Sequence, residues 1–411
     1  MKTVGIVVEY NPLHNGHVLH YERSKALTGA DAVVAVMSGP FLQRGEPAIA
    51  SKRARAEMAL RMGADLVIEL PVAYAVQPAE WFAHGAVALL AGTGVVDSLC
   101  FGSESGTLEQ LLPLARLLAR ETEQLQAEMA NRLQQGDNFP AAYAAAAAAV
   151  FAQGEHDAES LRQMLARPNN SLGLHYLIAL ERLKASIKPY TIPRESAQYH
   201  DQVPGSASIA SATAIRRLIL TEGLQAVSPY IPEYTLDILE REMENGQAPM
   251  HWERFRQPLL QTLLTRGPQQ LETLHEVTEG LEFRIRRQLP RLAEPTVEAL
   301  LDALKTKRYT RTKLQRMLVH VMLNHGKARM SRSALAEGPG YLRILGFSST
   351  GRALLKRMKK TASLPVVMKP SAFEHPQLDL DLRAAAVYAA GCPQPLLGQL
   401  YSDYLLPPVT I

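Results

Sequence analysis

The stretch Gly5-Ile-Val-Val-Glu-Tyr-Asn-Pro-Leu-His-Asn-Gly-His17 decides how this chain folds. Its β-branched opening predicts a buried strand over Val4–Glu9, and the apolar spacing that follows predicts a helix over Gly16–Leu27. The turn between them lies beyond the carboxyl end of a strand and at the start of a helix. Free backbone N–H groups and the positive end of the helix dipole make such a turn a binding place for phosphate.

The same alternation continues through the first hundred residues. Further strands are predicted at Ala32–Met37, Asp65–Glu69 and Ser98–Gly102, and further helices at Ser51–Met62 and Ala79–Leu90. Strands and helices in this order form right-handed βαβ units with a parallel sheet covered on both faces. The sequence therefore predicts a Rossmann-like α/β core.

At 411 residues the chain exceeds what one core usually serves, so two domains are expected. Helical patterns interrupt the α/β core at about 108–185 before strand character returns at Ile187–Ile192, and beyond Pro232 the pattern is helical almost throughout. We predict an α/β domain over residues 1–225 with a helical insertion, then a mostly α-helical domain over 226–411. The helices expected in the second domain are Leu236–Met243, His251–Thr265, Pro268–Glu279, Glu282–Leu289, Val297–Leu304 and Arg311–Asn324.

Positive charge is concentrated in one part of the second half. Residues 301–360 hold 15 Lys and Arg against 2 Asp and Glu, whereas the whole chain has a net charge of only +4. So few acidic residues favour a polyanion such as RNA as the partner. The alternative is a solvated helix face that is balanced by acidic neighbours in space.

Composition and termini point to an ordinary globular protein. The N-terminus lacks the pattern of a secretory signal, and no apolar run is long enough to span a bilayer, so a cytoplasmic location without membrane association is expected. Cys100 and Cys392 lack disulfide or zinc-ligand spacing and are expected to be buried apolar residues.

Two histidines flank Gly16 at the mouth of the first strand. His14 and His17 are about one helical turn apart and can both donate to phosphate oxygens, while Gly16 lets the backbone approach a nucleotide closely. This segment resembles the HxGH signature of the nucleotidyltransferase superfamily, whose members attack the α-phosphate of ATP and release pyrophosphate.

A second segment, Ser211-Ala-Thr213-Ala-Ile-Arg216, resembles the other signature of that superfamily, Ile-Ser-x-Thr-x-x-Arg. Ala210 replaces the isoleucine, but the polar positions match. Ser211 and Thr213 would meet phosphate at a helix start, with Arg216 as a cation one turn deeper. The alternative is a plain Ser/Thr helix cap.

Further segments extend the resemblance across both predicted domains. The chain resembles the tRNA(Met) cytidine acetate ligase family in its first stretch and in Met37-Ser-Gly-Pro-Phe-Leu-Gln-Arg-Gly-Glu-Pro47, Phe101-Gly-Ser-Glu, Pro168-Asn-Asn-Ser-Leu-Gly, Tyr199-His-Asp and Arg308-Tyr-Thr-Arg-Thr-Lys-Leu-Gln-Arg316. The resemblance implies a nucleotidyltransferase domain that turns acetate and ATP into acetyl-adenylate and pyrophosphate. The acetyl group then passes to the N4 amine of the wobble cytidine of elongator tRNA(Met).

The resemblance also implies where ATP binds. The matching stretch is Val7, Val8, Glu9, Tyr10, Asn11, Pro12, Leu13, His14, Asn15, Gly16, His17, Val18, Leu19 and His20, joined by Gly102, Asn169 and Arg194. The ordinary alternatives for the last three are a turn glycine, a helix cap and a surface cation. Lys25 is a further candidate for neutralising phosphate charge, with a solvated surface lysine as the alternative, and Mg²⁺ is expected with ATP.

The basic segment supplies the expected tRNA contacts, because cations at three- and four-residue spacing can follow a phosphate backbone and a tyrosine can stack on a base. These are Lys305, Lys307, Arg308, Tyr309, Arg311, Lys313, Arg316, Lys356 and Lys359. The loop Met37–Pro47, rich in glycine and proline, is interpreted as a lid or acceptor-binding loop, with a rigid connector as the alternative.

Two rival functions remain at this stage. A small-molecule adenylyltransferase or carboxylate ligase of the same superfamily, such as pantothenate synthetase, would also need the HxGH motif but not the basic segment. A non-catalytic RNA-binding protein would need the basic segment but not His14, His17 and Arg216 together.

Overall fold

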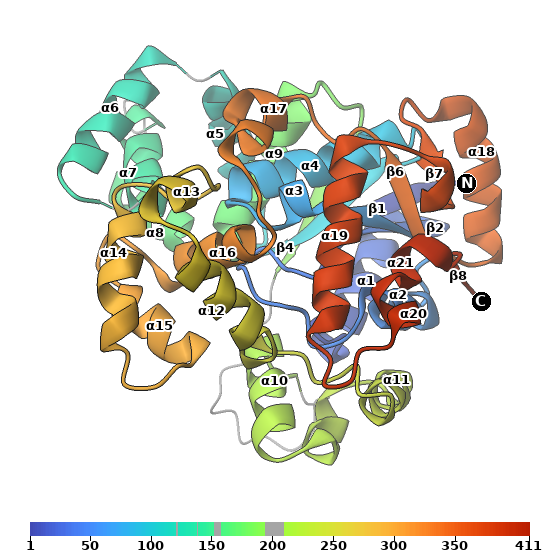
Figure 1. Cartoon of the computed structure of the whole chain (residues 1–411). Helices are drawn as coiled ribbons and strands as arrows, with labels where there is room; N and C mark the ends of the chain where they lie inside the picture. Colours follow the sequence, from blue (N-terminus) through green and yellow to red (C-terminus); the bar gives the residue numbers. More distant parts are fainter. Residues whose placement is uncertain (121, 138, 152–157, 194–208) are drawn as a thin grey trace.

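The computed structural model describes residues 1–120, 122–137, 139–151, 158–193 and 209–411. Its strands are β1 (Thr3–Val8), β2 (Ala32–Ser38), β3 (Leu66–Leu70), β4 (Ser98–Ser103), β5 (Lys188–Pro193), β6 (Leu342–Phe347), β7 (Val366–Val367) and β8 (Val409–Thr410). They form one sheet in the order β5-β4-β1-β2-β3-β6-β7, with β8 paired to β6 (Figure 1).

Strands β1 to β5 run parallel, as predicted for a Rossmann-like core. The order reverses at β1, which lies between β2 and β4. In open α/β sheets the crevice beyond the carboxyl ends of the strands at such a reversal is the usual ligand site. The turn that carries both histidines leaves β1 at this crevice.

The alternation of β2 shows why both faces of the sheet are covered. Val34 and Val36 belong to one cluster of buried side chains, and Val33 and Ala35 belong to another. Successive side chains of a strand point to opposite faces, so an uninterrupted apolar strand needs a helical layer on each side. The first cluster includes residues of α4 (Ala79–Gly92), α5 (Leu111–Ala119) and α9 (Pro168–Arg182), and the second includes residues of α2 (Lys52–Met62), α10 (Ala212–Thr221) and α11 (Glu233–Glu244).

The remaining helices of the first half confirm the predicted helical insertion. α1 (Asn15–Thr28) follows β1, and the short α3 (Val72–Ala75) follows β3. Between β4 and β5 the chain forms α5, α6 (Glu123–Gln134), α7 (Phe139–Phe151), α8 (Ala158–Ala166) and α9.

The chain after β5 is mostly helical, as predicted. Its elements are α10, η1 (Leu224–Tyr230), α11, η2 (Trp252–Phe255), α12 (Arg256–Thr265), α13 (Pro268–Glu272), α14 (Leu281–Gln288), η3 (Leu289–Arg291), α15 (Val297–Leu304), α16 (Arg311–Met322), η4 (Lys327–Met330), α17 (Arg332–Ala336), α18 (Ser349–Thr361), η5 (Pro370–Ala372), α19 (Pro376–Ala390), α20 (Leu397–Leu400) and α21 (Ser402–Leu405). Residues of α12, α14, α15 and α16 share a third apolar cluster, separate from the two that flank the sheet.

One predicted helix is too long. The pattern predicts a helix over Pro268–Glu279, but α13 ends at Glu272. Beyond it Leu274 forms a bridge with Gly326, and the backbone N–H of Lys327 donates to Thr273 O (2.9 Å). Contacts with a distant segment replace the helical hydrogen bonds, and local apolar spacing carries no information about such contacts.

The C-terminal region also contributes strands that the sequence analysis does not predict. β6 pairs antiparallel with β3, and β8 pairs parallel with β6. The last seventy residues therefore extend the N-terminal sheet beyond β3. The predicted boundary between two domains at residues 225 and 226 stays a prediction. The helices α12, α14, α15 and α16 have their own apolar cluster, but β6 and β8, which follow them, belong to the sheet of the N-terminal half.

Candidate functional site

The turn after β1 holds two imidazole rings in contact. His14 is the N-cap of α1, and its Nδ1 accepts a hydrogen bond from the backbone N–H of Gly16 (3.1 Å). The Nδ1 of His17 accepts from the backbone N–H of His14 (3.2 Å), and the ring centroids lie 3.8 Å apart. An accepting Nδ1 carries no proton, so the proton of each neutral ring is on Nε2. The start of α1 thus fixes both histidines as Nε2–H donors, the form that suits a phosphate oxygen.

Gly16 and Tyr10 hold this pair in place. A Cβ on Gly16 would lie 2.9 Å from Cε1 of His14, so a side chain there would displace that ring. Tyr10 is buried and contacts the His17 ring edge-on, with centroids 5.0 Å apart. From the sequence Gly16 is expected to let a nucleotide approach the backbone closely, and the structure adds that the His14 ring itself needs a glycine there.

Arg216 connects the second motif to the first. Its Nη1 donates to the backbone O of Asn11 (3.1 Å), and its Nη2 donates to Oε2 of Glu46 (2.7 Å). Ser211 is the N-cap of α10 and accepts from the backbone N–H of Ala214 (3.2 Å), which is the capping role that the sequence analysis gives as the alternative. The structure thus brings the two motifs together through Arg216.

A buried arginine that the sequence analysis does not identify supports the same edge of the sheet. Arg55 of α2 has no exposed surface. Its guanidinium donates to the backbone oxygens of Glu9 (2.7 Å), Ser38 (3.0 Å), Gly39 and Ala50 (3.2 Å). The oxygens of Glu9, Ser38 and Gly39 lie at or just beyond the carboxyl ends of β1 and β2, and Ala50 lies just before α2. The sequence could have indicated this role, because Arg55 lies between small apolar residues of its helix. A charge buried at such a position requires hydrogen-bonding partners.

Glu9 ties the end of β1 to the loop that follows β2. Its Oε1 accepts from the hydroxyl of Ser38 (3.1 Å) and from the backbone N–H of Gln43 (2.8 Å). Burial raises the pKa of Glu9, and these two hydrogen bonds oppose that rise. Gln43 also donates through Nε2 to the backbone O of Gln77 (2.9 Å), so the loop reaches the segment after α3.

The loop at 39–47 is packed against the helical region. Gly45 has a φ of +77°, and a Cβ on it would lie 2.2 Å from the backbone N of Arg316 in α16. Within the loop, Leu42 N–H donates to Glu46 O (2.9 Å), and Ala48 N–H donates to Pro40 O (2.9 Å). This packing supports the rigid connector that the sequence analysis weighs against a lid.

A second network links the end of β4 to the start of α9. Oε1 of Glu104 accepts from the side-chain N–H of Asn169 (2.6 Å), and its Oε2 accepts from the backbone N–H of Asn170 (2.7 Å). Oδ1 of Asn170 accepts from the backbone N–H of Ser105 (3.0 Å). Burial alone would raise the pKa of Glu104, but the hydrogen bonds from Asn169 and Asn170 hold it below its usual value. Asn169, a predicted ATP contact, is thus bonded to Glu104, which lies two residues after Gly102, another predicted ATP contact.

Other predicted residues lie elsewhere. Lys25 is in the last turn of α1, and eight residues of helix place it roughly 12 Å along the axis from His17. The structure does not bring it to the histidines, because the helix runs away from the crevice. Thr213 is exposed in the first turn of α10. Arg194 lies outside the described residues.

Many of the predicted tRNA contacts on and before α16 are paired with acids. Arg308 forms two hydrogen bonds with Glu279, each 2.9 Å, and Arg311 is bonded to Glu298. Lys313 Nζ lies 3.9 Å from Oε2 of Glu279. These acids precede residue 301, so the local charge count does not include them. In this part of the segment the alternative expectation therefore holds: the basic residues lie on a helix face that is balanced by acidic neighbours in space.

Arg316 is the clearest departure from the expected tRNA contacts. Its side chain is only 11% exposed and donates through Nε to Oε1 of Glu276 (2.9 Å), which is 9% exposed. An arginine with so little accessible surface is not presented to a tRNA. Basic spacing alone cannot say which side of a helix faces the core. Lys305 and Lys307, by contrast, are exposed in the turn before α16.

Lys356 and Lys359 are exposed on α18, which lies near the amino ends of the parallel strands. In this region Ser348 N–H donates to Asp65 O (2.9 Å) and Ser363 N–H donates to Gly92 O (3.0 Å). Asp65 and Gly92 both precede strands, so α18 covers the amino edge of the parallel strands. Figure 1 shows α18 at the right of the view and α16 left of its centre. The predicted tRNA contacts therefore form two separate groups.

A buried histidine cluster joins the segment after α3 to α16. His320 Nδ1 lies 3.0 Å from Nδ1 of His325, and its Nε2 lies 2.9 Å from the backbone O of Val76. His275 Nε2 lies 3.2 Å from Oε1 of Gln77. Burial lowers the pKa of His275 to about 4 and that of His325 to about 3. The cluster is therefore neutral near pH 7.

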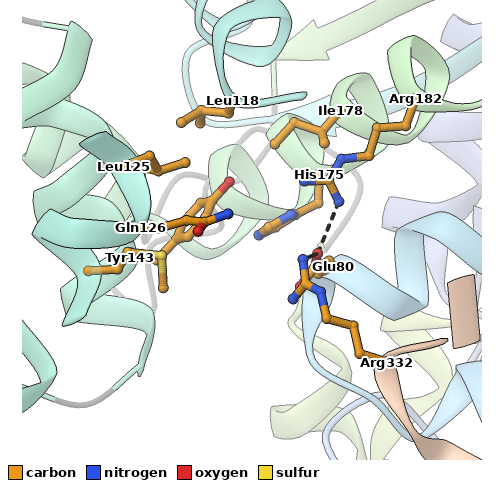
Figure 2. Close-up of a pocket in the computed structure, with 10 residues that line it drawn as sticks. Glu80, Leu118, Leu125, Gln126, Tyr143, His175, Ile178, Arg182 and Arg332 are labelled. Carbon is orange, nitrogen blue, oxygen red and sulfur yellow. Dashed lines mark hydrogen bonds and ion pairs between the residues drawn. The ribbon is translucent and has the colours of Figure 1, made fainter. Parts of the chain in front are cut away.

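A pocket of about 320 Å³ lies between α5, α6 and α7 on one side and α4 and α9 on the other (Figure 2). On one side Tyr143 is stacked with His175, with centroids 5.2 Å apart. On the other, Oε1 of Glu80 pairs with Arg182 (3.0 Å) and Arg332 (3.3 Å). Burial lowers the pKa of His175 to about 4. No predicted site residue lines this pocket.

No group of three or more His, Cys, Asp or Glu side chains among the described residues is arranged to hold a metal ion. No helix within the described ranges combines the length and apolar character needed to cross a membrane.

Comparison with known proteins identifies relatives along the whole chain. The family model described as HIGH Nucleotidyl Transferase matches residues 1–399. A protein of Geobacillus sp. (strain WCH70) named tRNA(Met) cytidine acetate ligase is 40% identical over 413 residues, with 100% of both chains covered. One of the same name from Halalkalibacterium halodurans is 43% identical over 401 residues, covering 96% of this chain and 94% of the relative.

A solved structure agrees in fold over the same length. Thermotoga maritima TmcAL bound with alpha-thio ATP superposes with a TM-score of 0.90 at 35% identity, covering 100% of this chain and 99% of that one. The apo form of the same protein gives a TM-score of 0.91, also at 35% identity. Together with the joined HxGH and Arg216 motifs, full-length identity of this extent places the chain in the tRNA(Met) cytidine acetate ligase family, within the HIGH nucleotidyltransferases.

Proposed function

We propose that this protein activates acetate with ATP and transfers the acetyl group to N4 of the wobble cytidine of elongator tRNA(Met). One observation carries the proposal furthest. Two imidazoles are fixed as Nε2–H donors at the carboxyl end of β1, and the arginine of the second motif is bonded to the backbone of the same turn. This is an arrangement for a nucleoside triphosphate at the reversal of strand order.

The first step needs charge neutralisation and alignment. An acetate oxygen attacks the α-phosphorus of ATP, the bond to pyrophosphate breaks, and acetyl-adenylate forms. Both reactants are anions, so the Nε2–H groups of His14 and His17 and the guanidinium of Arg216 would stabilise the charge that develops on the phosphate oxygens. Glu9 and Arg55 would act indirectly by holding the ends of β1 and β2 in place. Donors that are already in position need little rearrangement, and therefore little free energy, to reach the geometry of the reaction.

In the second step the cytidine N4 attacks the acetyl carbonyl. AMP leaves with the electron pair of the anhydride bond, and N4 loses a proton. No covalent bond to the protein is required. The packed loop at 39–47 would limit the access of water to the adenylate.

Mg²⁺ is proposed to accompany ATP. Protein sites for Mg²⁺ commonly use one or two carboxylates together with substrate phosphates and water.

The proposed tRNA surface has two groups of cations. The first group lies on or just before α16, which contacts the loop at 39–47, and consists of Lys305, Lys307, Arg308, Tyr309, Arg311 and Lys313. The second group lies on α18 and consists of Lys356 and Lys359. The two groups are tested by Lys305→Ala/Lys307→Ala and Lys356→Ala/Lys359→Ala, each of which removes two charges. A group that contacts phosphates gives weaker tRNA binding and a smaller salt dependence when it is neutralised.

The decisive experiment for the activity is pyrophosphate exchange. The purified protein is incubated with ATP, labelled pyrophosphate and a panel of carboxylic acids, with and without elongator tRNA(Met). We expect exchange with acetate and formation of N4-acetylcytidine at the wobble position when tRNA is present. Exchange restricted to a different acid would indicate another carboxylate ligase. Absence of exchange with every acid, in protein that binds tRNA, would leave an RNA-binding protein.

A further inference from the structure

Helix α14 exposes an aromatic ring between cations. Phe283 is 62% exposed, and Arg286 and Arg287, three and four residues later, are also exposed. Side chains at these spacings are neighbours on one face of a helix. The opposite side of α14 is buried through Leu281 and Ile285, so the orientation of the exposed side is fixed by the core.

The turn before α16 adds two more cations to this surface. Arg284 donates through Nε to the backbone O of Leu304 (2.8 Å) and through Nη2 to that of Ala303 (2.8 Å). These bonds hold the exposed Lys305 and Lys307 beside α14. We call Phe283, Arg286, Arg287, Lys305 and Lys307 the α14 face. In the described part of the chain no ion pair involves its four cations, unlike Arg308 and Arg311 nearby.

The α14 face is also connected to the proposed reaction site. Arg311, which follows the same turn, has its pKa raised by the hydrogen bond to Glu298, and the carboxylate of Glu46 adds to that effect. Glu46 is the partner of Arg216. The backbone of Arg316 in α16 packs on Gly45 of the same loop. The surface is therefore on the side of the molecule towards which the strands point, whereas α18 covers the other edge.

We propose that the α14 face docks an RNA loop, with Phe283 stacked on an unpaired base and the four cations in contact with phosphates. Unpaired bases of RNA are commonly recognised by stacking on exposed aromatic rings, and lysine and arginine supply the electrostatic part. This inference rests on the proposed function, since it says where the tRNA of that reaction lies. It adds Phe283, Arg286 and Arg287 to the residues expected from sequence.

The test measures equilibrium binding of an elongator tRNA(Met) transcript over a series of KCl concentrations, without ATP or acetate. Loss of one stacked base weakens binding roughly 5- to 150-fold, so we expect a change in this range for Phe283→Ala. Phe283→Trp should bind tRNA about as tightly as the parent protein, because tryptophan can also stack on a base. Arg286→Ala/Arg287→Ala should reduce the slope of log K against log salt by about 1.4 to 1.8, the value for two phosphate contacts.

A matched control is Lys2→Ala/Lys188→Ala. Both lysines are exposed at the amino ends of β1 and β5, and this variant removes the same amount of charge. Circular dichroism and thermal unfolding establish that each variant is folded. If the parent protein binds no tRNA, the proposed function and this inference both fail. If the parent binds, and the α14 variants behave like the control, the inference alone is wrong.

Discussion

Gly45→Ala tests whether the loop at 39–47 is locked against α16. Two costs are expected. Gly45 has a φ of +77°, a conformation that costs a residue with a Cβ roughly 1–2 kcal/mol. The new Cβ would also lie 2.2 Å from the backbone N of Arg316 and 2.4 Å from the carbonyl carbon of Gln315.

The second cost is the larger. Non-bonded carbon atoms prefer separations of about 3.5–4.0 Å, and neither backbone atom belongs to a flexible side chain that can turn away. The loop or the helix must therefore move by about 1 Å or more, and overpacking of this kind typically costs about 1–3 kcal/mol. We expect Gly45→Ala to lower the free energy of unfolding by about 2–5 kcal/mol in total.

Gly246→Ala is the matched control. Gly246 has a φ of +67°, and a Cβ there would meet nothing within 4 Å. This substitution introduces the conformational cost without the clash, so a loss of about 1–2 kcal/mol is expected. The difference between the two variants isolates the contact between the loop and α16.

The assays are urea unfolding and acetate-dependent pyrophosphate exchange. A displaced loop should also disturb the Glu46–Arg216 bond and the Gln43–Glu9 bond, so exchange should fall in Gly45→Ala and persist in Gly246→Ala. Equal losses of stability in the two variants, with equal exchange, would refute the idea that this loop connects α16 to the reaction site.

Three other predictions concern the site and the histidine cluster. His17→Ala should abolish pyrophosphate exchange while tRNA binding persists, because it removes one of the two Nε2–H donors; retained exchange would contradict this role. Glu104→Ala should raise the KM for ATP by freeing Asn169, while Arg116→Ala, at an exposed ion pair, should not change it. The pKa of His275 is about 4, below the 6.5 of an exposed imidazole, so the unfolded chain takes up a proton first and stability falls as pH decreases from 6.5 towards 4. Urea unfolding should show that His275→Gln reduces the loss of unfolding free energy between neutral pH and pH 5 by about 2 kcal/mol; an unchanged pH dependence would exclude this contribution.

The sequence alone predicted the α/β core because its signals are local. An apolar β-branched run such as Val4–Val8, followed by a capped helix, has few other ways to be buried. The joined motifs were also predictable, since the carboxyl ends of parallel strands meet at one edge of a sheet. His14, Gly16 and His17 are close in sequence, and their mutual geometry follows from the start of one helix.

The tertiary structure decided what depends on distant partners. Glu276, Glu279 and Glu298 pair with cations on and just before α16, and Arg316 is buried, yet no local spacing indicates either result. β6 returns to pair with β3 after more than 270 residues, and this pairing brings α18, which follows β6, to the sheet. Arg55 and Glu104 likewise acquire their roles from backbone groups of other elements. Local sequence determines which elements form, whereas the electrostatic surroundings of a side chain depend on which elements pack together.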